Sequence, residues 1–540
     1  MSFEREMLVL ADRVHTLSAG VEGDAFLVRE GIVRAVGDAD SLRRSAPDAE
    51  VLDLRGATIT PGLSDSHLHL VDWSLARREV QLYGSASAEE AAAAVGRHVE
   101  KTGGTGWVRG RGWAANVWHD FPHRKLLDRY VPDRPVFLYS QDMHGLWANT
   151  RALELAGITG ETPDPDGGRI LRDESGEPTG VLLEHAMHLL ERHVPPVDEA
   201  ELEAAVLDAQ NELHRLGITA IHSVPSLFPG RLDPLVVTGS LRSKDRLRLR
   251  VLQHIPLELL DEALQLGLRS GLGDDWIRIG GIKMFVDGAL GSRTAWMREP
   301  YVGTDDVGVQ VLPDADFRDA VRRAAAGGLA STVHAIGDAA VSLALDVLGA
   351  PETRVAALPH RIEHIQLCPP ERLGDAGRTG IVLSVQPAHL ITDWKATNRY
   401  WGVERSRTAY AFGSLLAGGA TLAFGSDAPV EPVDPRLGFH AAVLRQDLEG
   451  EPAGGWYPEE RLDALATLRG YTAGPAHAAG MAGRLGTLAP GALADFVAWD
   501  RDPLAVGADE LRGLRCTATV VGGEVVWREA AGATGALAAD

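Results

Sequence analysis

From about residue 211 to residue 424, the chain alternates short apolar segments with longer segments of helical composition, such as 200–216 and 317–327. The apolar segments have the length of buried strands. They are 59–66, which comes earlier in the chain, and 218–224, 247–255, 277–286, 329–336, 361–367, 381–385 and 421–424. Eight strands that alternate with helices predict an α/β fold, a TIM-type (β/α)8 barrel, whose catalytic groups lie at the C-terminal ends of the strands.

The two ends of the chain show a different pattern, with short strand-like segments separated by turn residues. These segments are 7–10, 25–28, 32–36 and 51–54 near the N-terminus, and 494–499, 517–521 and 524–527 near the C-terminus, where Gly522 and Gly523 predict a tight hairpin. Neither end has enough strands for a good core of its own. We therefore expect residues 1–60 and 483–530 to form one composite β-sandwich, and residues 61–72 and 212–482 to form the barrel.

Residues 73–211 separate the first predicted barrel strand from the second. A connection of this length must fold on its own or be functional. It contains a helix-like segment at 88–101 and the tryptophans Trp73, Trp107, Trp113, Trp118 and Trp147, but no convincing buried strand. We predict an inserted α+β domain that caps the substrate site. An insert with a packing role alone is the open alternative.

Composition excludes some classes of partner. Asp and Glu number 75 against 53 Lys and Arg, which gives a formal net charge of −22, whereas a nucleic-acid partner needs a basic face. The two cysteines do not indicate a disulfide framework. We find no apolar run long enough to cross a bilayer and no apolar signal segment. We expect a cytoplasmic protein with a small-molecule amide substrate, and neither a nucleic-acid nor a membrane partner.

Polar residues that bind metals occur at the ends of five predicted strands. His67 and His69 follow the first strand two residues apart, so both side chains point to the same face of an extended chain. Strand four carries Lys283, strand five ends at His334, strand six carries His364 and strand eight ends at Asp427. A single histidine on an apolar strand is usually a core residue, but this set at the strand ends of a barrel predicts a metal centre.

The residues around these positions form specific motifs. They are Pro-Gly-Leu-Ser-Asp-Ser-His-Leu-His from Pro61, Lys-Met-Phe-Val-Asp-Gly-Ala-Leu-Gly-Ser-Arg-Thr-Ala from Lys283, His-Ala-Ile-Gly-Asp from His334, Arg-Ile-Glu-His from Arg361, Ser-Val-Gln-Pro from Ser384 and Gly-Ser-Asp-Ala-Pro-Val from Gly425. Taken together, they resemble the amidohydrolase superfamily, and within it the amidohydrolase-3 group of YtcJ-like metal-dependent hydrolases, over nearly the whole chain. The resemblance also implies the composite β-sandwich, and relatives make a homodimer plausible.

The resemblance implies the metal ligands. His67, His69 and Asp427 would hold one divalent ion, expected to be Zn2+. His334 and His364 would hold a second ion, and Lys283, as a carboxylated lysine, would bridge both in a binuclear metal centre, because a carbamate is an anionic oxygen ligand. The sequence leaves open whether one or two ions bind and whether Lys283 is carboxylated. A neutral lysine and an ion pair of Lys283 with Asp287 or another carboxylate are the alternatives.

The same centre predicts hydrolysis. A metal lowers the pKa of water toward ~7, so a metal-bound hydroxide exists at neutral pH, and Asp427 can take its proton and pass it to a leaving amine. We expect a hydrolase of carbon–nitrogen bonds other than peptide bonds (EC 3.5), with an N-acyl or N-formyl amide as substrate. The alternatives are a cyclic amide (hydantoin or lactam) hydrolase, a deaminase with the same centre, and an inactive barrel that serves as a binding scaffold.

Five further residues are candidate substrate contacts. They are Trp113, Asp142 and His144 in the insert, His222 after strand two and Arg293 after strand four. For His222, a core position is an equally good interpretation. Residues 360–364, His-Arg-Ile-Glu-His, also fit the pattern of inverted zinc peptidases, but that chemistry needs a helix, and the β-branched Ile362 and Ile365 favour a strand.

Overall fold

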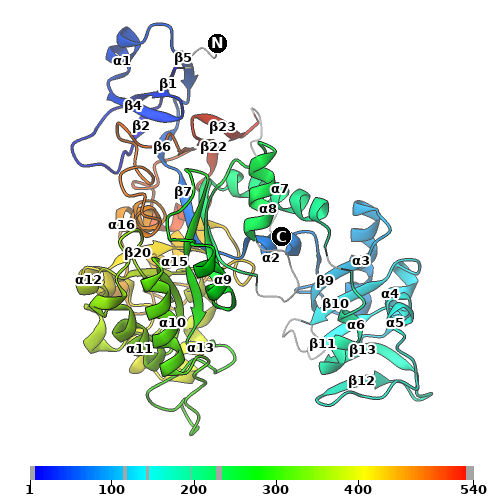
Figure 1. Cartoon of the computed structure of the whole chain (residues 1–540). Coiled ribbons are helices and arrows are strands. Elements are labelled where there is room, and N and C mark those ends of the chain that lie inside the picture. The colour runs from blue at the N-terminus through cyan, green and yellow to red at the C-terminus, as the bar shows by residue number, and fades with distance from the viewer. Residues whose placement is uncertain are drawn as a thin grey trace. The chain divides into compact units, whose positions relative to one another are not determined.

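The computed structural model describes residues 6–113, 118, 120–140, 145–195, 197–226 and 234–530 (Figure 1). The chain divides into two compact units. Of the described residues, the first unit contains those up to Val71 and those from Val206 onward, and the second contains those of Asp72–Ala205. The boundaries fall within α2 (Leu70–Ala76) and α7 (Glu199–Arg215). No helix in the described part of the chain is long and apolar enough to cross a membrane.

The first unit contains an eight-stranded sheet in which neighbouring strands pair in parallel. Its strands are, in sheet order, β7 (Leu63–Leu68), β14 (Ile218–Ser223), β15 (Arg250–Pro256), β16 (Ile277–Phe285), β17 (Ser331–Ala335), β18 (Arg361–His364), β19 (Val382–Val385) and β20 (Thr421–Phe424). After β20, the N–H of Asp427 donates to the carbonyl of His67, and the N–H of His69 donates to the carbonyl of Ala428. These bonds connect the last strand to the first, and the predicted TIM-type barrel is confirmed.

The first predicted strand, 59–66, is two strands in the structure. β6 (Thr58–Pro61) pairs with β21 (Phe496–Trp499) outside the barrel, and β7 begins at Leu63. Between them, the N–H of Gly62 donates to the carbonyl of Asp495 and not to a barrel strand. The turn dipeptide Pro61-Gly62 marks the break in the sequence, and the predicted segment passed over it.

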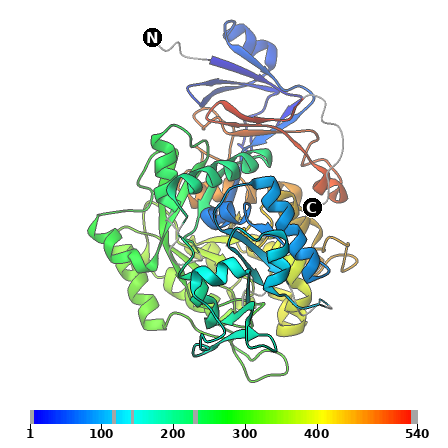
Figure 2. The ribbon, with the colours of Figure 1, turned by 90° about the vertical axis from the view of Figure 1, so that its right-hand side faces the viewer.

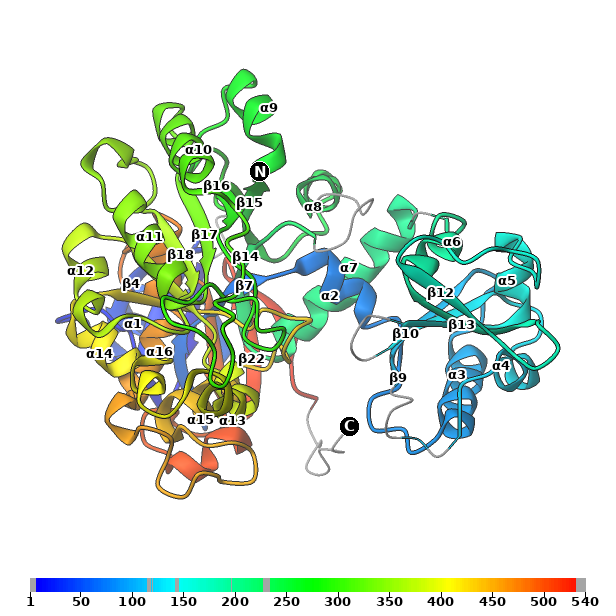
Figure 3. The ribbon, with the colours of Figure 1, turned by 90° about the horizontal axis from the view of Figure 1, so that it is seen from below.

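Helices alternate with the barrel strands. They are α8 (Pro234–Ser243), α9 (Leu260–Gln265), α10 (Asp314–Ala326), α11 (Asp338–Leu348), α12 (Asp375–Thr379), α13 (His389–Trp401), α14 (Phe412–Ala417), α15 (Pro435–Leu444), α16 (Ala464–Gly470) and α17 (Ala473–Ala478). Figure 3 shows α10, α11 and α12 outside strands β16 to β18. α10 buries Phe317, Val321 and Ala324 at helical spacing, so one face of this helix packs inward and the other faces water.

Strands from both ends of the chain form two small sheets. One sheet has the order β4 (Ile32–Gly37), β3 (Ala25–Arg29), β1 (Glu6–Leu10) and β5 (Glu50–Asp53), and the other has the order β2 (Arg13–Val14), β6, β21, β22 (Cys516–Val521) and β23 (Glu524–Arg528). Figure 2 shows the blue N-terminal strands beside the red C-terminal strands. Their shared core includes Val9, Phe26 and Phe496, and the last two rings meet edge to face with centroids 5.0 Å apart.

The second unit combines a six-stranded sheet with short helices. The sheet order is β12 (Gly168–Arg172), β13 (Pro178–Glu184), β11 (Gly145–Ala148), β10 (Val136–Ser140), β9 (Val108–Trp113) and β8 (Val80–Gln81), and the helices are α3 (Ala88–Thr102), α4 (Arg124–Tyr130), α5 (Thr150–Ala156) and α6 (His188–Glu191). The expectation that this region lacks convincing buried strands is wrong, because β10 and β11 are almost entirely buried.

Candidate metal centre

The predicted ligands all lie in the first unit, at the C-terminal ends of barrel strands. His67 lies on β7 and His69 directly after it, Lys283 lies on β16, His334 on β17 and His364 at the end of β18, and Asp427 follows β20. All six residues are buried. The barrel therefore brings together polar side chains that are as far apart in the sequence as His67 and Asp427.

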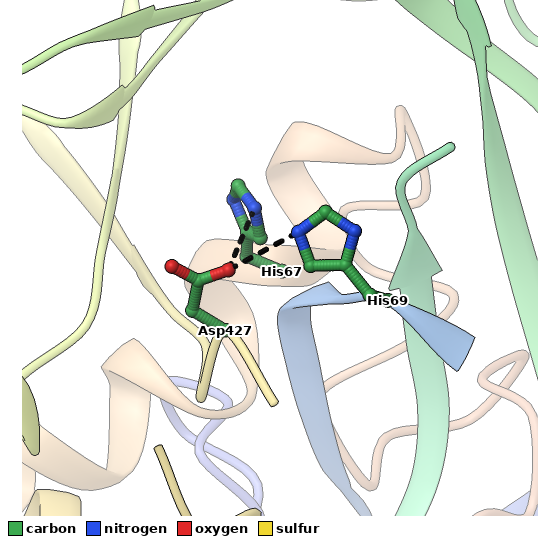
Figure 4. A group of neighbouring side chains, drawn as sticks. All are labelled: His67, His69 and Asp427. Carbon is green, nitrogen blue, oxygen red and sulfur yellow. Dashed lines mark ion pairs between the residues drawn. The ribbon is translucent and has the colours of Figure 1, made fainter. Parts of the chain in front are cut away.

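His67, His69 and Asp427 form a compact group of possible ligands (Figure 4). The Nε2 atoms of both histidines lie 3.3 Å from Oδ1 of Asp427. In a tetrahedral zinc site with bonds of ~2.0–2.1 Å, neighbouring ligand atoms lie ~3.3 Å apart. The spacing of these atoms therefore fits three ligands of one divalent ion.

The other ring nitrogen of each of these histidines has a hydrogen-bond acceptor. Nδ1 of His67 is bonded to Oε2 of Glu363, and Nδ1 of His69 is bonded to the carbonyl of Pro225 at 2.9 Å. When Nδ1 carries the proton and donates it to such an acceptor, the lone pair of Nε2 is left for a metal. Both imidazoles are thus oriented toward Asp427 in the form that binds an ion.

The backbone at this centre is strained. Asp427 (φ 63°) and His364 (φ 71°) adopt left-handed conformations, which cost energy in a residue that has a Cβ atom. Gly425, close to Asp427, packs so tightly on β7 that an added Cβ atom would lie 2.4 Å from the backbone nitrogen of His67. Backbone strain of this kind is concentrated at functional sites.

His334 and His364 lie on neighbouring strands with their ring centroids 4.5 Å apart. Nε2 of His334 donates to the carbonyl of Gly288 at 3.0 Å, which leaves Nδ1 for a metal, and Nδ1 of His364 donates to Oε1 of Gln386 at 2.8 Å. On this side of Asp427, however, the compact group of possible ligands in the described chain contains His364 and His389, not His334. His389 is not among the ligands predicted from the sequence, and the role of His334 as a ligand stays a prediction.

Lys283 is a buried amine whose Nζ has no hydrogen-bond partner among the described residues. Burial lowers the pKa of this amine to about 8, although the charges of Glu363 and Asp427 oppose the shift. Among the described residues no ion pair joins Lys283 to Asp287, whose carboxylate accepts hydrogen bonds from the backbone N–H groups of Trp296, Ile336 and Gly337. A buried nitrogen without a partner is costly, so this position calls for a further group.

Burial also sets the charge of the other candidate ligands. It lowers the pKa of His67, lowers that of His334 to about 3, and holds that of His364 well below its ordinary value, so these imidazoles are neutral, as metal ligands must be. Burial opposes the ionisation of Asp427, but its interactions with His67, His69 and His364 outweigh this effect and hold the pKa of the carboxyl well below its ordinary value. The site therefore presents neutral nitrogen donors around one carboxylate.

A buried polar network supports the centre from inside the barrel. The guanidinium of Arg361 donates from Nε to Glu363, from Nη1 to Nδ1 of His222 at 2.7 Å, and from Nη2 to Ser384 at 2.7 Å. Arg361 and Glu363 were not predicted as site residues, although both belong to the Arg-Ile-Glu-His motif. They lie two residues apart on β18, so their side chains point to the same face of the strand. The bond to Arg361 accounts for His222 as a core histidine.

A second missed residue, Asp65, joins the ends of the first and last strands. Its carboxylate accepts hydrogen bonds from the N–H of His67 and from the N–H and hydroxyl of Ser426, next to Asp427. Burial raises the pKa of Asp65 to about 6. Its position two residues before His67 in the same motif was the signal available in the sequence.

The remaining predicted substrate contacts lie in different environments. Trp113 belongs to the core of the second unit, where its Nε1 donates to the carbonyl of Leu138 at 2.8 Å, and this packing explains the residue without a substrate. Arg293 is exposed, with its guanidinium 5.7 Å from the ring centroid of Tyr400. Asp142 and His144 lie outside the described residues.

The structure does not support the peptidase pattern at residues 360–364. Residues Arg361–His364 form strand β18 and not a helix. His360 accepts the N–H of Ser331 at Nδ1, at 2.9 Å, and its Nε2 is bonded to the carbonyl of Thr353. Both of its ring nitrogens are used by the backbone, so His360 is a structural residue.

The fold and the site define a metal-dependent hydrolase built on a TIM-type barrel. The chain belongs to the amidohydrolase family, whose sequence model (Amidohydro_3) matches residues 50–527. It is 32% identical over 519 residues to YtcJ of Bacillus subtilis, a protein named as an amidohydrolase, with 95% of this chain and 97% of the relative covered. It is 29% identical over 548 residues to the N-substituted formamide deformylase of Arthrobacter pascens, with 97% and 98% covered.

A solved structure supports the same assignment. The crystal structure of an uncharacterized metal-dependent hydrolase from Pyrococcus horikoshii superposes on this chain with a TM-score of 0.78 and 30% sequence identity. The match covers 93% of this chain and 99% of the other. The likeness therefore extends over the barrel, the terminal sheets and the second unit.

Proposed function

We propose that this chain hydrolyses a non-peptide carbon–nitrogen bond with the help of a divalent metal ion, and that its substrate is an N-acyl or N-formyl amide. The observation that carries the proposal is the group of His67, His69 and Asp427, in which two Nε2 atoms lie 3.3 Å from one carboxylate oxygen. The similarity to an N-substituted formamide deformylase supports the choice of amide class.

The donor set fits zinc, because imidazole nitrogens and a carboxylate oxygen are the ligands that this ion prefers. When bound, such an ion supplies a water of lowered pKa and polarises a carbonyl. The ionised carboxylate of Asp427 then has two tasks: it accepts the proton of the attacking water, and it donates that proton to the leaving nitrogen.

As part of the same proposal, Lys283 is carboxylated and helps to bind a second ion. With a pKa of about 8, a fraction of the amine is neutral near pH 7.5, and only the neutral amine reacts with carbon dioxide. In that reaction a bond forms between Nζ and the carbon of carbon dioxide, and one proton leaves the nitrogen. The resulting carbamate would give the unpartnered Nζ position an anionic group that can bind two cations.

The test is a screen of the zinc-loaded full chain against N-formyl amines, N-acyl amines, N-acyl amino acids, hydantoins, lactams and aminopurines. We expect turnover of an acyclic amide, and its loss in His67→Ala. Selective turnover of a hydantoin or lactam would show that the enzyme is a cyclic amide hydrolase. Selective turnover of an aminopurine would show that it is a deaminase. Binding without turnover of any substrate would favour a scaffold.

A capping role for the second unit and a homodimer are further parts of the proposal. Kinetics of second-unit variants test the capping role, and light scattering tests the homodimer.

A further inference from the structure

His389 is a buried histidine next to the centre that the expected ligand set leaves unused. It is the first residue of α13, and its N–H donates to the carbonyl of Gln386 at 3.2 Å, in the turn that follows β19. Its side chain is only 9% exposed, and its Nε2 has no hydrogen-bond partner in the described part of the chain. Strand seven, which supplied no predicted ligand, thus brings an unused imidazole nitrogen to the site.

The two oxygens of Asp427 face two different pairs of histidines. Oδ1 faces His67 and His69, as described above. Oδ2 lies 3.6 Å from Nε2 of His389. It lies 3.9 Å from Nδ1 of His364, but this nitrogen donates to Gln386, so the nitrogen of His364 that is left for a metal is Nε2. The ligand atoms of His364, His389 and Asp427 all lie within 4.8 Å of one another, as do those of the first group. A distance of 3.6 Å is too long for a hydrogen bond but fits two ligands of one ion.

Gln366, the neighbour of Nδ1 of His389, supports the role of Nε2 of His389 as a ligand atom. Nδ1 of His389 lies 3.4 Å from the side-chain amide of Gln366, whose Oε1 is buried without a partner among the described residues. The oxygen and nitrogen of such an amide have the same shape and can be exchanged. With the oxygen next to Nδ1, the ring donates to Gln366 and the lone pair of Nε2 faces Asp427, as His67 does through Glu363.

We propose that His389 is a metal ligand, which together with His364 and Asp427 holds a divalent ion on the Oδ2 side of Asp427. The inference rests on the proposed function, since it concerns the same centre, and it adds a ligand from α13, which follows the seventh barrel strand β19, to the expected set. Asp427 would then contribute one lone pair of each oxygen to an ion, and the remaining lone pairs would still be able to accept the proton of the attacking water. His334 lies beside His364 and is not required for this group.

The first experiment measures metal binding by the full-length protein. Wild type, His389→Ala, His389→Gln and the control His440→Ala are stripped of metal and titrated with Zn2+ and Co2+, and bound ions are counted by elemental analysis. His440 is a matched control, because it is a buried histidine at a helix, bonded to the carbonyl of Asp447 at 3.1 Å and not part of either ligand group. Melting temperatures show which variants fold.

We expect wild type and His440→Ala to bind the same number of ions with the same affinity. Both His389 variants should keep the ion of His67, His69 and Asp427 and bind the other at least ~10–100 times more weakly. Free imidazole should restore binding to His389→Ala. Unchanged binding in both His389 variants would overturn the inference and leave the proposed function intact, whereas a wild type that binds no ion would overturn the proposed function and the inference with it.

A second experiment does not depend on any variant. Crystals of the wild type grown with Zn2+ are measured at the zinc absorption edge, and anomalous difference density locates the ions. We expect a peak ~2.0–2.3 Å from Nε2 of His389. A zinc peak on His364 with His389 more than ~3 Å away would overturn the inference, because such a distance excludes a bond.

Discussion

Nδ1 of His67 is hydrogen-bonded to the carboxylate of Glu363, while Nε2 of the same ring lies 3.3 Å from Asp427. The two carboxylates therefore lie on opposite sides of one imidazole. Burial raises the cost of ionising Glu363, but its interactions with Arg361 and His67 outweigh this cost and hold the pKa of its carboxyl well below the ordinary value. An ionised Glu363 fixes the proton of His67 at Nδ1 and makes Nε2 a stronger ligand.

Glu363→Gln should weaken metal binding ~10–100-fold, because an amide oxygen is a poorer acceptor for the Nδ1 proton than a carboxylate. The measurement is competition for zinc with a chelator of known affinity. Ser384→Ala is the control, since it removes a different partner of the same Arg361 guanidinium. If the two variants lose metal affinity equally, the effect comes from Arg361 and not from the bond between Glu363 and His67.

Asp427→Asn should lower kcat by ~10²–10⁴, because an amide cannot accept and return the proton. The histidines remain, so some bound metal should remain as well, and kinetics should be read together with metal content. Asp447→Asn provides a control at another buried aspartate, one that is bonded to Lys395. Near-normal turnover by a metal-loaded Asp427→Asn would contradict the assigned role of proton carrier.

Lys283→Ala should lose the ion on the Oδ2 side of Asp427 and nearly all activity, because it removes the anionic bridge that offsets the repulsion of two cations. Short carboxylic acids such as formate or acetate should partly restore both, since they fit the space that the side chain leaves. Lys395→Ala is the control at an exposed lysine. Intact-protein mass spectrometry gives a direct check, in which a metallated wild type without an added carboxyl group argues for a mononuclear enzyme.

The barrel, and the strand ends at which the expected ligands lie, could be predicted because their signals are local. Each barrel strand is a short apolar run bounded by turns, and each expected ligand lies at the end of one run, within a family motif. The turn dipeptide Pro61-Gly62 marks the break between β6 and β7, but no pattern in the sequence shows that the two strands pair in different sheets.

The site residues that the sequence analysis missed act through contacts that no spacing predicts. Glu363 is recognised by its bond to His67, a residue 296 positions away. His389 stands four residues after β19, in a helix, and its relation to Asp427 is visible only when the loops after the seventh and eighth strands are placed in space. Trp113 shows the converse, because its aromatic ring suggested a substrate contact and the structure places it in a core.

A further prediction concerns pH and a histidine outside the centre. His214, on α7, is buried, and its Nε2 donates to the carbonyl of Arg248 at 2.9 Å. Burial lowers the pKa of His214 to about 4. Between the ordinary pKa of about 6.5 and this value, the unfolded chain binds a proton at this residue that the folded chain does not bind. The free energy of unfolding is therefore not reduced by His214 above pH 6.5, and it decreases as the pH falls from 6.5 toward 4.

His214→Gln, which keeps an N–H donor but cannot titrate, isolates this effect. Burial raises the pKa values of Asp65 and Asp287 to about 6 and about 7, so these residues change the free energy of unfolding in the same pH range and in the opposite direction. Their effect is the same in both proteins and cancels when the two are compared at each pH. On going from pH 7 to pH 5, the unfolding free energy of the wild type should fall by about 2 kcal/mol relative to that of His214→Gln. Denaturant titrations of the metal-free proteins at both pH values measure this difference, and a difference that stays constant with pH would show that His214 titrates normally in the folded chain.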